Sequence, residues 1–232
     1  MRRPCICLYL LRAASQGESI YLRVKKYLAG KKPGTKAWHH QHHRVGVQES
    51  CPQNNFRRII AALIPKGNFC NHKINYFPEP QCSFPLSVLL AILNSKLSDW
   101  YFRLGSSNAS VNHYQLYNLP APSFSSTTPE DRMPDGFVNA LKRKKWDEAF
   151  ALIEPLLAAP PFPPTSIASL IRLVEEISRI ETARGEIARA ERSALAPEAQ
   201  PYQDLIDRIL YRMAGLTDAE AQGLEKRLEG ML

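Results

Sequence analysis

The sequence predicts an α+β protein, in which a small mixed β-lobe with a packed long helix is followed by a helical C-terminal tail. Three observations support this prediction: short β-favouring runs separated by glycine and proline fill the first third, a periodic apolar stretch follows Pro85, and another follows a proline-rich segment. The chain has 232 residues, of which 44% are hydrophobic and 22% are charged. This balance is typical of globular proteins and excludes wholesale disorder.

The first third contains four runs that we expect to form strands, at residues 19–28, 43–47, 56–64 and 73–77. Each run is rich in β-branched or aromatic residues, and the runs are separated by chain breakers that include Gly30, Pro33, Pro52 and Pro65. We therefore expect strands joined by loops in this part of the chain.

A long helix is expected over residues 86–104, because apolar side chains recur there at intervals of three and four residues. Gly105 should end this helix. Residues 106–128 are polar and then carry Pro120 and Pro122, so we expect a loop, whereas residues 134–157 have a helical pattern. Residues 155–164 contain five prolines and should form a stiff connector.

The tail should begin with a long amphipathic helix that is capped by Thr165 or Ser166. Its apolar stripe needs a partner surface, either in the same chain or in another subunit. Two shorter helices are expected at 202–214 and 217–228. The stripe consists of Ile167, Leu170, Ile171, Val174, Ile177, Ile180 and Ile187, and it extends toward Leu195.

These elements divide the chain into four regions. Residues 1–42 form a basic N-terminal segment that could be the remnant of a longer enzyme, and residues 43–128 form the β-lobe with its helix. Residues 129–164 supply a helix and the proline-rich connector, and residues 165–232 supply the helical tail. We find no internal repeat.

The positive charge of the chain is concentrated in its first third. The net charge is +8, but residues 1–80 hold 14 Lys and Arg residues against 3 acidic ones, together with five of the six histidines. Such a surface favours a polyanion as its partner, because each neutralised phosphate releases condensed counterions. A solvated basic lobe without a partner is the alternative.

Cysteine usage and hydropathy favour the cytoplasm. The five cysteines are an odd number without regular spacing, which suits a reducing compartment better than a disulfide scaffold. The apolar run near the N-terminus is stopped by Arg12 and is too short for a signal peptide. The apolar stretch at 82–95 is too short to cross a bilayer, so we expect no membrane association.

Several enzyme classes are disfavoured by missing motifs. No two glycines are two residues apart, as a glycine turn for S-adenosylmethionine or a dinucleotide requires, and no asparagine precedes a proline, as the base-holding loop of an adenine methyltransferase requires. None of the 22 acidic residues has a lysine two positions later, a spacing that many restriction nucleases use. The histidines at 39–43 lack a second pair of ligands at regular spacing. We expect no catalytic residue, no metal site and no cofactor bound by this chain alone.

Residues 51–122 hold the side chains best suited to DNA. Arginine pairs bidentately with guanine, asparagine and glutamine pair with adenine, and lysine contacts phosphate. Polar residues just beyond a rigid helix also lie where recognition residues often occur. The expected DNA-binding residues are Asn54, Asn55, Arg57, Arg58, Lys66, Lys73, Asn75, Lys96, Ser106, Asn108, Asn112, His113 and Gln115. Because Arg57 and Arg58 are adjacent in an expected strand, at most one of them can face a groove.

The order of the motifs resembles a known family. RRIIAALIP at 57–65 is followed by LAILNSKL at 90–97, DWYFR at 99–103, YQL at 114–116 and LPAP at 119–122, and the tail contains LIDRILYR at 205–212 and GLT at 215–217 with Glu220. Over roughly residues 43–124 and 202–220, this arrangement closely resembles the TaqI-like C-terminal specificity domain. That domain is the target-recognition part of adenine-specific DNA methyltransferases and of type IIG restriction-modification enzymes.

The resemblance implies sequence-specific recognition of double-stranded DNA for a restriction-modification or adenine-methylation system. In such proteins the catalytic half precedes this domain, whereas only about 40 residues precede it here. S-adenosylmethionine is thus implied for a missing or separate catalytic part. The chain is then a truncated or split enzyme, or a specificity subunit that works with a methyltransferase or endonuclease subunit.

The alternative function is a helical protein–protein interaction module with an incidental basic lobe. In that case the stripe from Ile167 to Ile187 would serve as the dimer or partner interface.

Overall fold

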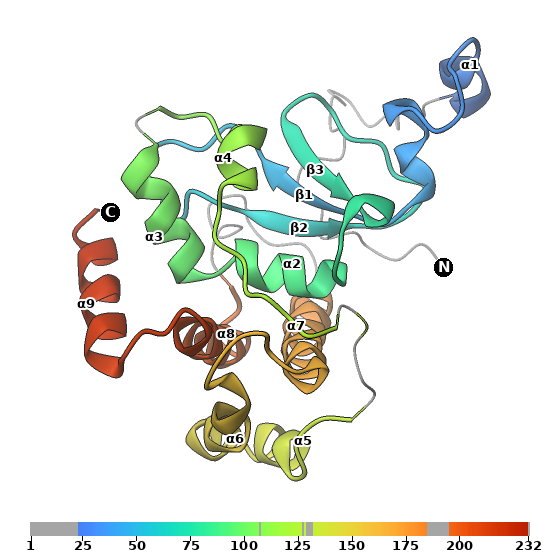
Figure 1. The fold of residues 1–232 in the computed structure, drawn as a ribbon. Coiled ribbons are helices and arrows are strands. Elements are labelled where there is room, and N and C mark those ends of the chain that lie inside the picture. The colour runs from blue at the N-terminus through green and yellow to red at the C-terminus, as the bar shows by residue number, and fades with distance from the viewer. Residues whose placement is uncertain (1–22, 107, 127, 129–131, 185–194, 232) are drawn as a thin grey trace.

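The fold is built around a three-stranded antiparallel sheet with the strand order β2-β1-β3 (Figure 1). The computed structural model describes residues 23–106, 108–126, 128, 132–184 and 195–231. The central strand β1 (Arg44–Gln48) pairs with β2 (Ala61–Ile64) on one side and with β3 (Ile74–Pro78) on the other. Together with the many helices, this sheet confirms the α+β class expected from the sequence.

Helices surround the sheet and extend away from it (Figure 1). α1 lies beyond one end of the sheet, and α5 and α6 lie at the opposite pole of the molecule. None of the described helices is both long and apolar enough to cross a membrane. The α-helices are α1 (Val24–Leu28), α2 (Leu86–Leu93), α3 (Lys96–Gly105), α4 (His113–Tyr117), α5 (Phe137–Lys142), α6 (Trp146–Ile153), α7 (Pro164–Arg184), α8 (Gln200–Met213) and α9 (Asp218–Glu229), and the 3-10 helices are η1 (Lys36–Gln41), η2 (Glu79–Gln81) and η3 (Glu154–Leu157).

Alternate residues of β1 point to opposite faces of the sheet. Val45 and Val47 are fully buried and pack in one hydrophobic cluster with residues of α2, which contacts both β1 and β2. Gly46 points to the other face, where a Cβ atom would lie only 2.5 Å from Cδ1 of Ile64. A larger residue at this position would force the neighbouring side chains to shift, because the interior is close-packed.

The expected continuous helix at 86–104 is wrong, because the chain breaks between α2 and α3 at Asn94 and Ser95. The Asn94 amide is bonded to the edge strand β2: its Oδ1 accepts the Ala61 N–H (3.0 Å) and its Nδ2 donates to the Ala61 carbonyl oxygen (3.0 Å). The Ser95 hydroxyl caps α3 by accepting the N–H of Ser98 (3.1 Å). These bonds satisfy an exposed strand edge and a helix start, which a continuous helix would leave unpaired.

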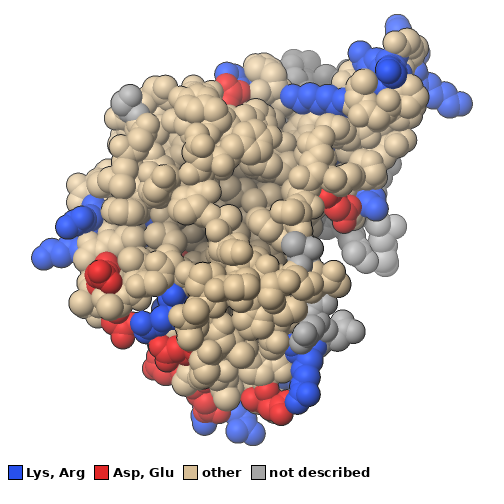
Figure 2. Space-filling model, in the orientation of Figure 1, with Lys and Arg blue, Asp and Glu red and all other residues tan. Residues whose placement is uncertain are grey.

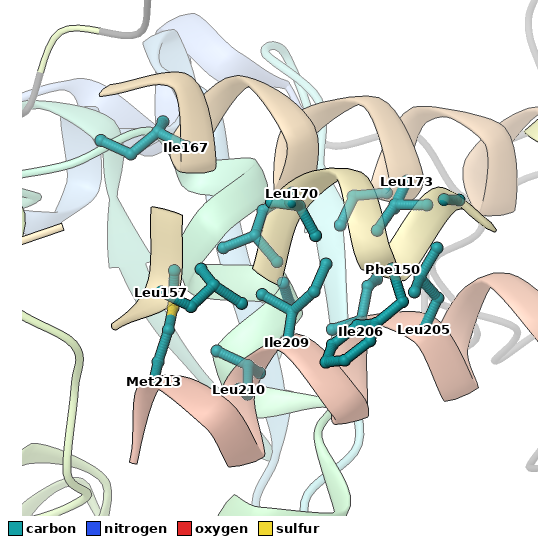
Figure 3. Packing of buried hydrophobic residues seen from close by; sticks show 14 of the residues in the cluster. Phe150, Leu157, Ile167, Leu170, Leu173, Leu205, Ile206, Ile209, Leu210 and Met213 are labelled. Carbon is teal, nitrogen blue, oxygen red and sulfur yellow. The ribbon is translucent and has the colours of Figure 1, made fainter. Parts of the chain in front are cut away.

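The apolar stripe of α7 finds a partner surface within the chain. Ile167, Leu170 and Val174 are at most 6% exposed, and α7 contacts both α2 and α8. Figure 3 shows the side chains of α7 and α8 meeting in this core, which also contains residues of α6. The expected stripe member Ile187 lies outside the described residues.

Helix α2 belongs to both hydrophobic cores of the protein. Val88 and Ile92 pack with the helical core of α5 to α8, whereas Leu86 and Leu93 pack with the sheet. The β-lobe and the helical tail therefore share one helix, and the position of the sheet is tied to that of the tail.

Five further predictions about the elements differ from the structure. The described part of the expected strand at 19–28 contains the helix α1, which includes the good helix formers Lys25 and Lys26. Of the expected strand at 56–64, only Ala61–Ile64 forms a strand, β2. The expected loop at 106–128 contains α4. The expected helix at 134–157 is divided into α5 and α6, because Lys144 between them adopts a positive φ of 58°. α7 begins at Pro164, so the expected caps Thr165 and Ser166 lie within its first turn.

Candidate nucleic-acid interface

A concentration of exposed positive charge lies on α1, on η1 and on the turn after β2. The sequence has no acidic residue between positions 23 and 48. Figure 2 shows Lys and Arg side chains gathered over α1. The Gly67 N–H donates to the His40 carbonyl oxygen (2.7 Å), which holds the turn after β2 against η1. We call this surface the basic lobe, and its exposed members are Arg23, Lys25, Lys26, Lys31, Lys32, Lys36 and Lys66.

Aromatic rings support the lysines of the basic lobe. The Lys31 ammonium lies 4.9 Å from the centre of the Tyr27 ring, and the Lys36 ammonium lies 5.5 Å from the centre of the Tyr76 ring on β3. Tyr27 in turn meets Phe69 edge to face, with ring centres 5.4 Å apart. Cation–π contacts of this kind orient a lysine without neutralising its charge, so the ammonium groups stay available for an anion.

The histidine cluster lies beside a buried arginine. Arg44 is 2% exposed, its guanidinium donates to the carbonyl oxygen of Asn68, and it lies 5.1 Å from the centre of the Tyr76 ring. Burial, and then the nearby charge of Arg44, lower the pKa of His39. The Nδ1 atoms of His39 and His43 are buried without a hydrogen-bond partner in the described structure. Among the described residues, no group of three or more His, Cys, Asp or Glu side chains could hold a metal ion.

Arg58, which we expected to contact DNA, lies inside the β-lobe and is 1% exposed. Its guanidinium donates to the Asn108 carbonyl oxygen (2.5 Å) and to Ser106 Oγ (3.4 Å), and it lies 5.2 Å from the centre of the Phe102 ring. Burial lowers the pKa of Arg58. The guanidinium thus shapes the loop after α3, and it does not face a DNA groove from the surface.

Another arginine, Arg103, whose side chain is only 5% exposed, holds the loop that leads into β2. Arg103 pairs with Asp99 one turn earlier in α3 (2.8 Å), and it donates to the carbonyl oxygens of Gln53 (2.9 Å) and Asn55 (2.8 Å). The Asp99 carboxylate also accepts the backbone N–H of Arg58 (2.6 Å). This network fixes residues 53–58 against α3.

The two loops that the arginines hold lie side by side. The Cys51 N–H donates to the Ala109 carbonyl oxygen (2.8 Å), and the loops also share a short β-bridge. Asn54 on the first loop and Asn108 on the second are both exposed. We call the surface formed by Asn54 and Asn108 the asparagine surface.

Several other expected DNA-binding residues are bonded within the chain. Asn55 Nδ2 donates to the Arg57 carbonyl oxygen (2.9 Å), and the Arg57 guanidinium donates to the Asn94 carbonyl oxygen (2.6 Å). Asn75 Nδ2 donates to the Val111 carbonyl oxygen (2.6 Å). All three side chains are half-buried, and their bonds explain their positions without a ligand.

Three expected residues at the start of α4 also have structural roles. Asn112 and Gln115 form a capping box, in which Gln115 Oε1 accepts the Asn112 N–H (3.0 Å). The half-buried ring of His113 lies nearly parallel to that of Tyr117, with centres 6.0 Å apart and planes at 21°. The side-chain oxygen of Gln115 is therefore already paired within the chain.

Lys96 lies in an acidic junction between α3, α8 and α9, and it does not project freely into solvent. Its ammonium pairs with Glu225 (2.9 Å) and Asp204 (3.6 Å). Its backbone N–H donates to Oδ1 of Asp207 (2.8 Å), and Tyr211 OH donates to the same Glu225 carboxylate (3.1 Å). Burial raises the pKa of Asp207 to about 7. This junction attaches α9 to the rest of the protein.

Four of the expected residues remain exposed. Asn54, Lys66 and Asn108 are exposed, although the Oδ1 atom of Asn108 also accepts the Ser110 N–H (3.1 Å). Lys73 is exposed, and its ammonium lies 3.6 Å from the Glu49 carboxylate. Lys66 belongs to the basic lobe, whereas Asn54 and Asn108 form the asparagine surface. Of the other expected residues, Arg58 and Ser106 are buried, and the rest are half-buried.

Sequence reasoning missed two kinds of surface residue. The first kind is the exposed lysines of two adjacent pairs, Lys25-Lys26 and Lys31-Lys32, and the pairing itself is the signal in the sequence. The tyrosines of α4, at 114 and 117, are 62% and 68% exposed. Their spacing of three residues around the buried Leu116 would have shown that they share one helix face.

Comparison with protein-family models, with curated proteins and with solved structures finds no match for this chain.

Proposed function

We propose that the chain binds double-stranded DNA through the basic lobe and serves as the target-recognition part of a restriction-modification or adenine-methylation system, without catalysis of its own. The observation that carries this proposal is the acid-free cluster of exposed lysines on α1, η1 and the turn after β2. Neutralising phosphates with such lysines releases counterions, which supplies most of the affinity for any DNA sequence.

The arrangement of the lobe supports phosphate contact. Within the described structure, Lys25, Lys26, Lys31 and Lys32 form no ion pair with a carboxylate. A phosphate group that binds these lysines therefore does not have to displace a carboxylate of the protein. Lys66 lies on a turn that is bonded to η1, so its charge adds to the same surface.

Base recognition is assigned in this proposal to the asparagine surface. An asparagine can pair bidentately with the N6 and N7 atoms of adenine in the major groove. Asn54 and Asn108 are exposed on adjoining loops that Arg58 and Arg103 hold by bonds to backbone carbonyls. The two arginines act as positioning residues, because rigid support of a reading side chain reduces the entropy lost on binding.

The experiment that tests this proposal is a salt titration of duplex DNA binding, with fluorescence anisotropy of a labelled duplex as the signal. The variant Lys25→Ala/Lys26→Ala removes two charges from the basic lobe. Lys142→Ala/Arg143→Ala removes two exposed charges from the end of α5, far from α1 in Figure 1, and is the matched control.

We expect wild-type affinity to fall steeply between about 50 and 200 mM salt. The lobe variant should reduce the slope of log K against log salt by about 2, or one for each lost phosphate contact, while the control keeps the wild-type slope. If both variants bind like the wild type, or if the affinity is independent of salt, the basic lobe does not bind phosphate.

A further inference from the structure

Helix α4 presents two tyrosine rings to solvent at one side of β3. Tyr114 and Tyr117 are 62% and 68% exposed and stand three residues apart, so they share a face of the helix. Figure 1 shows α4 beside the sheet, separated from α1 along it. We call these two rings the tyrosine platform. Neither ring belongs to the two hydrophobic core clusters, so packing in a core does not explain why tyrosine occupies these positions.

The Tyr117 ring and the backbone of Tyr114 are held in place by their surroundings. The Tyr117 ring meets Phe77 of β3 edge to face (5.5 Å between centres, 88° between planes) and lies nearly parallel to His113. The Tyr114 carbonyl oxygen accepts from Asn118 Nδ2 (2.8 Å), which closes the end of the helix. A ring that is ordered before binding, as Tyr117 is, loses little conformational entropy when a planar ligand stacks on it.

The segment that carries the platform holds no negative charge that would repel a nucleic acid. No charged residue occurs between positions 104 and 129. Phe77 contacts the platform, whereas its neighbour Tyr76 contacts Lys36 of the basic lobe, because adjacent strand residues point to opposite faces. The platform and the basic lobe therefore flank the same edge strand, β3. A nucleic acid that crosses this edge meets cations on one side and aromatic rings on the other.

We propose that the tyrosine platform binds unpaired nucleobases by stacking, so that the chain binds single-stranded DNA next to a duplex held by the basic lobe. This inference rests on the proposed function, because the basic lobe supplies the phosphate contacts. Every base has a π-face, so stacking tolerates any sequence, and it differs from the base-edge contacts assigned to Asn54 and Asn108.

The test compares two labelled probes, a blunt duplex and the same duplex with a single-stranded thymine extension. Binding is measured by anisotropy for the wild type, for Tyr114→Ala/Tyr117→Ala and for Tyr114→Phe/Tyr117→Phe, which keeps the rings. Tyr101→Ala is the matched control, because Tyr101 is 44% exposed on α3 and lies outside the platform. Circular dichroism establishes that each variant is folded.

The wild type should bind the extended probe more tightly than the blunt duplex. The double alanine variant should lose about 10-fold or more in affinity for the extended probe alone, in line with about 1 to 3 kcal/mol per stacked base. The phenylalanine variant and Tyr101→Ala should keep the wild-type preference.

The inference is overturned if the wild type binds both probes equally, or if the alanine variant weakens both probes to the same extent. A variant that leaves DNA binding unchanged but abolishes self-association in sedimentation would assign the rings to protein contact instead. Failure of the proposed function looks different, since the blunt duplex itself would then show no salt-dependent binding.

Discussion

Replacing the buried carboxylate of Asp207 by an amide should change how stability depends on pH. Asp207 is 1% exposed, its Oδ1 accepts the Lys96 N–H (2.8 Å), and its Oδ2 has no partner among the described residues. Burial raises its pKa from 3.8 to about 7, against the opposing effects of the Lys96 hydrogen bond and of the charges of Arg57 and Lys96. Asp207→Asn keeps an acceptor for the Lys96 N–H and removes the ionisation.

The sign of the effect follows from which state holds the proton more firmly. Because the pKa of Asp207 is higher in the folded than in the unfolded protein, the folded state binds more protons between about pH 4 and pH 7. The free energy of unfolding therefore falls as the pH rises through this range. A difference of about 3 pKa units corresponds to about 4 kcal/mol. The wild type should lose this much of its free energy of unfolding as the pH rises, and Asp207→Asn should not.

Urea unfolding followed by circular dichroism at pH 4, 6 and 8 measures this difference. Each free energy is taken as wild type minus Asp207→Asn, so that His39, whose lowered pKa acts in the opposite direction, cancels. Asp204→Asn, at the exposed side of the same junction, is the control and should leave the pH dependence of the wild type nearly intact. A difference between wild type and Asp207→Asn that is independent of pH, or that grows in favour of the wild type as the pH rises, would refute the reasoning.

Three other outcomes are expected. Asn94→Ala removes both bonds to the backbone of Ala61 and should lower the free energy of unfolding in urea by about 1 to 3 kcal/mol, whereas Asn118→Ala, which removes one exposed bond, should cost less than about 1 kcal/mol. In anisotropy, Lys66→Ala should lower the affinity for preferred and random duplexes alike and reduce the slope of log K against log salt by about 1. A loss of affinity for one sequence alone would contradict a phosphate contact. Titration calorimetry of the chain with S-adenosylmethionine should show no saturable binding, because the glycine turn is missing, and a saturable isotherm would contradict this expectation.

The parts of the fold that depend on local pattern could be predicted from the sequence. Strands were expected at 43–47 and 73–77, and β1 and β3 occupy 44–48 and 74–78. The break between α2 and α3 could not be predicted in the same way, because the apolar spacing continues across it. It depends on Asn94 bonding to Ala61, a partner 33 residues earlier that only the tertiary structure brings near.

The candidate interface could likewise be predicted only where it depends on composition, and not where it depends on tertiary contacts. The positive charge of the first third is a property of composition, so it is visible in the sequence. Whether a given arginine or asparagine faces solvent depends on distant partners: Arg58 is buried because Asn108 and Phe102 surround its guanidinium, and Asn75 is bonded to Val111. A list of suitable residue types therefore overestimates the number that can read DNA.

Selection from a pool of randomised duplexes is the measurement that tests the central proposal most directly. The full chain is incubated with the pool at about 150 mM salt, bound duplexes are sequenced over several rounds, and the affinity for the enriched sequence is compared with that for random DNA. A target-recognition protein should enrich one sequence and bind it at least about 10³-fold more tightly than random DNA, and Asn54→Ala or Asn108→Ala should reduce this ratio. Equal affinity for every sequence in the pool would contradict target recognition and leave only non-specific attraction by the basic lobe.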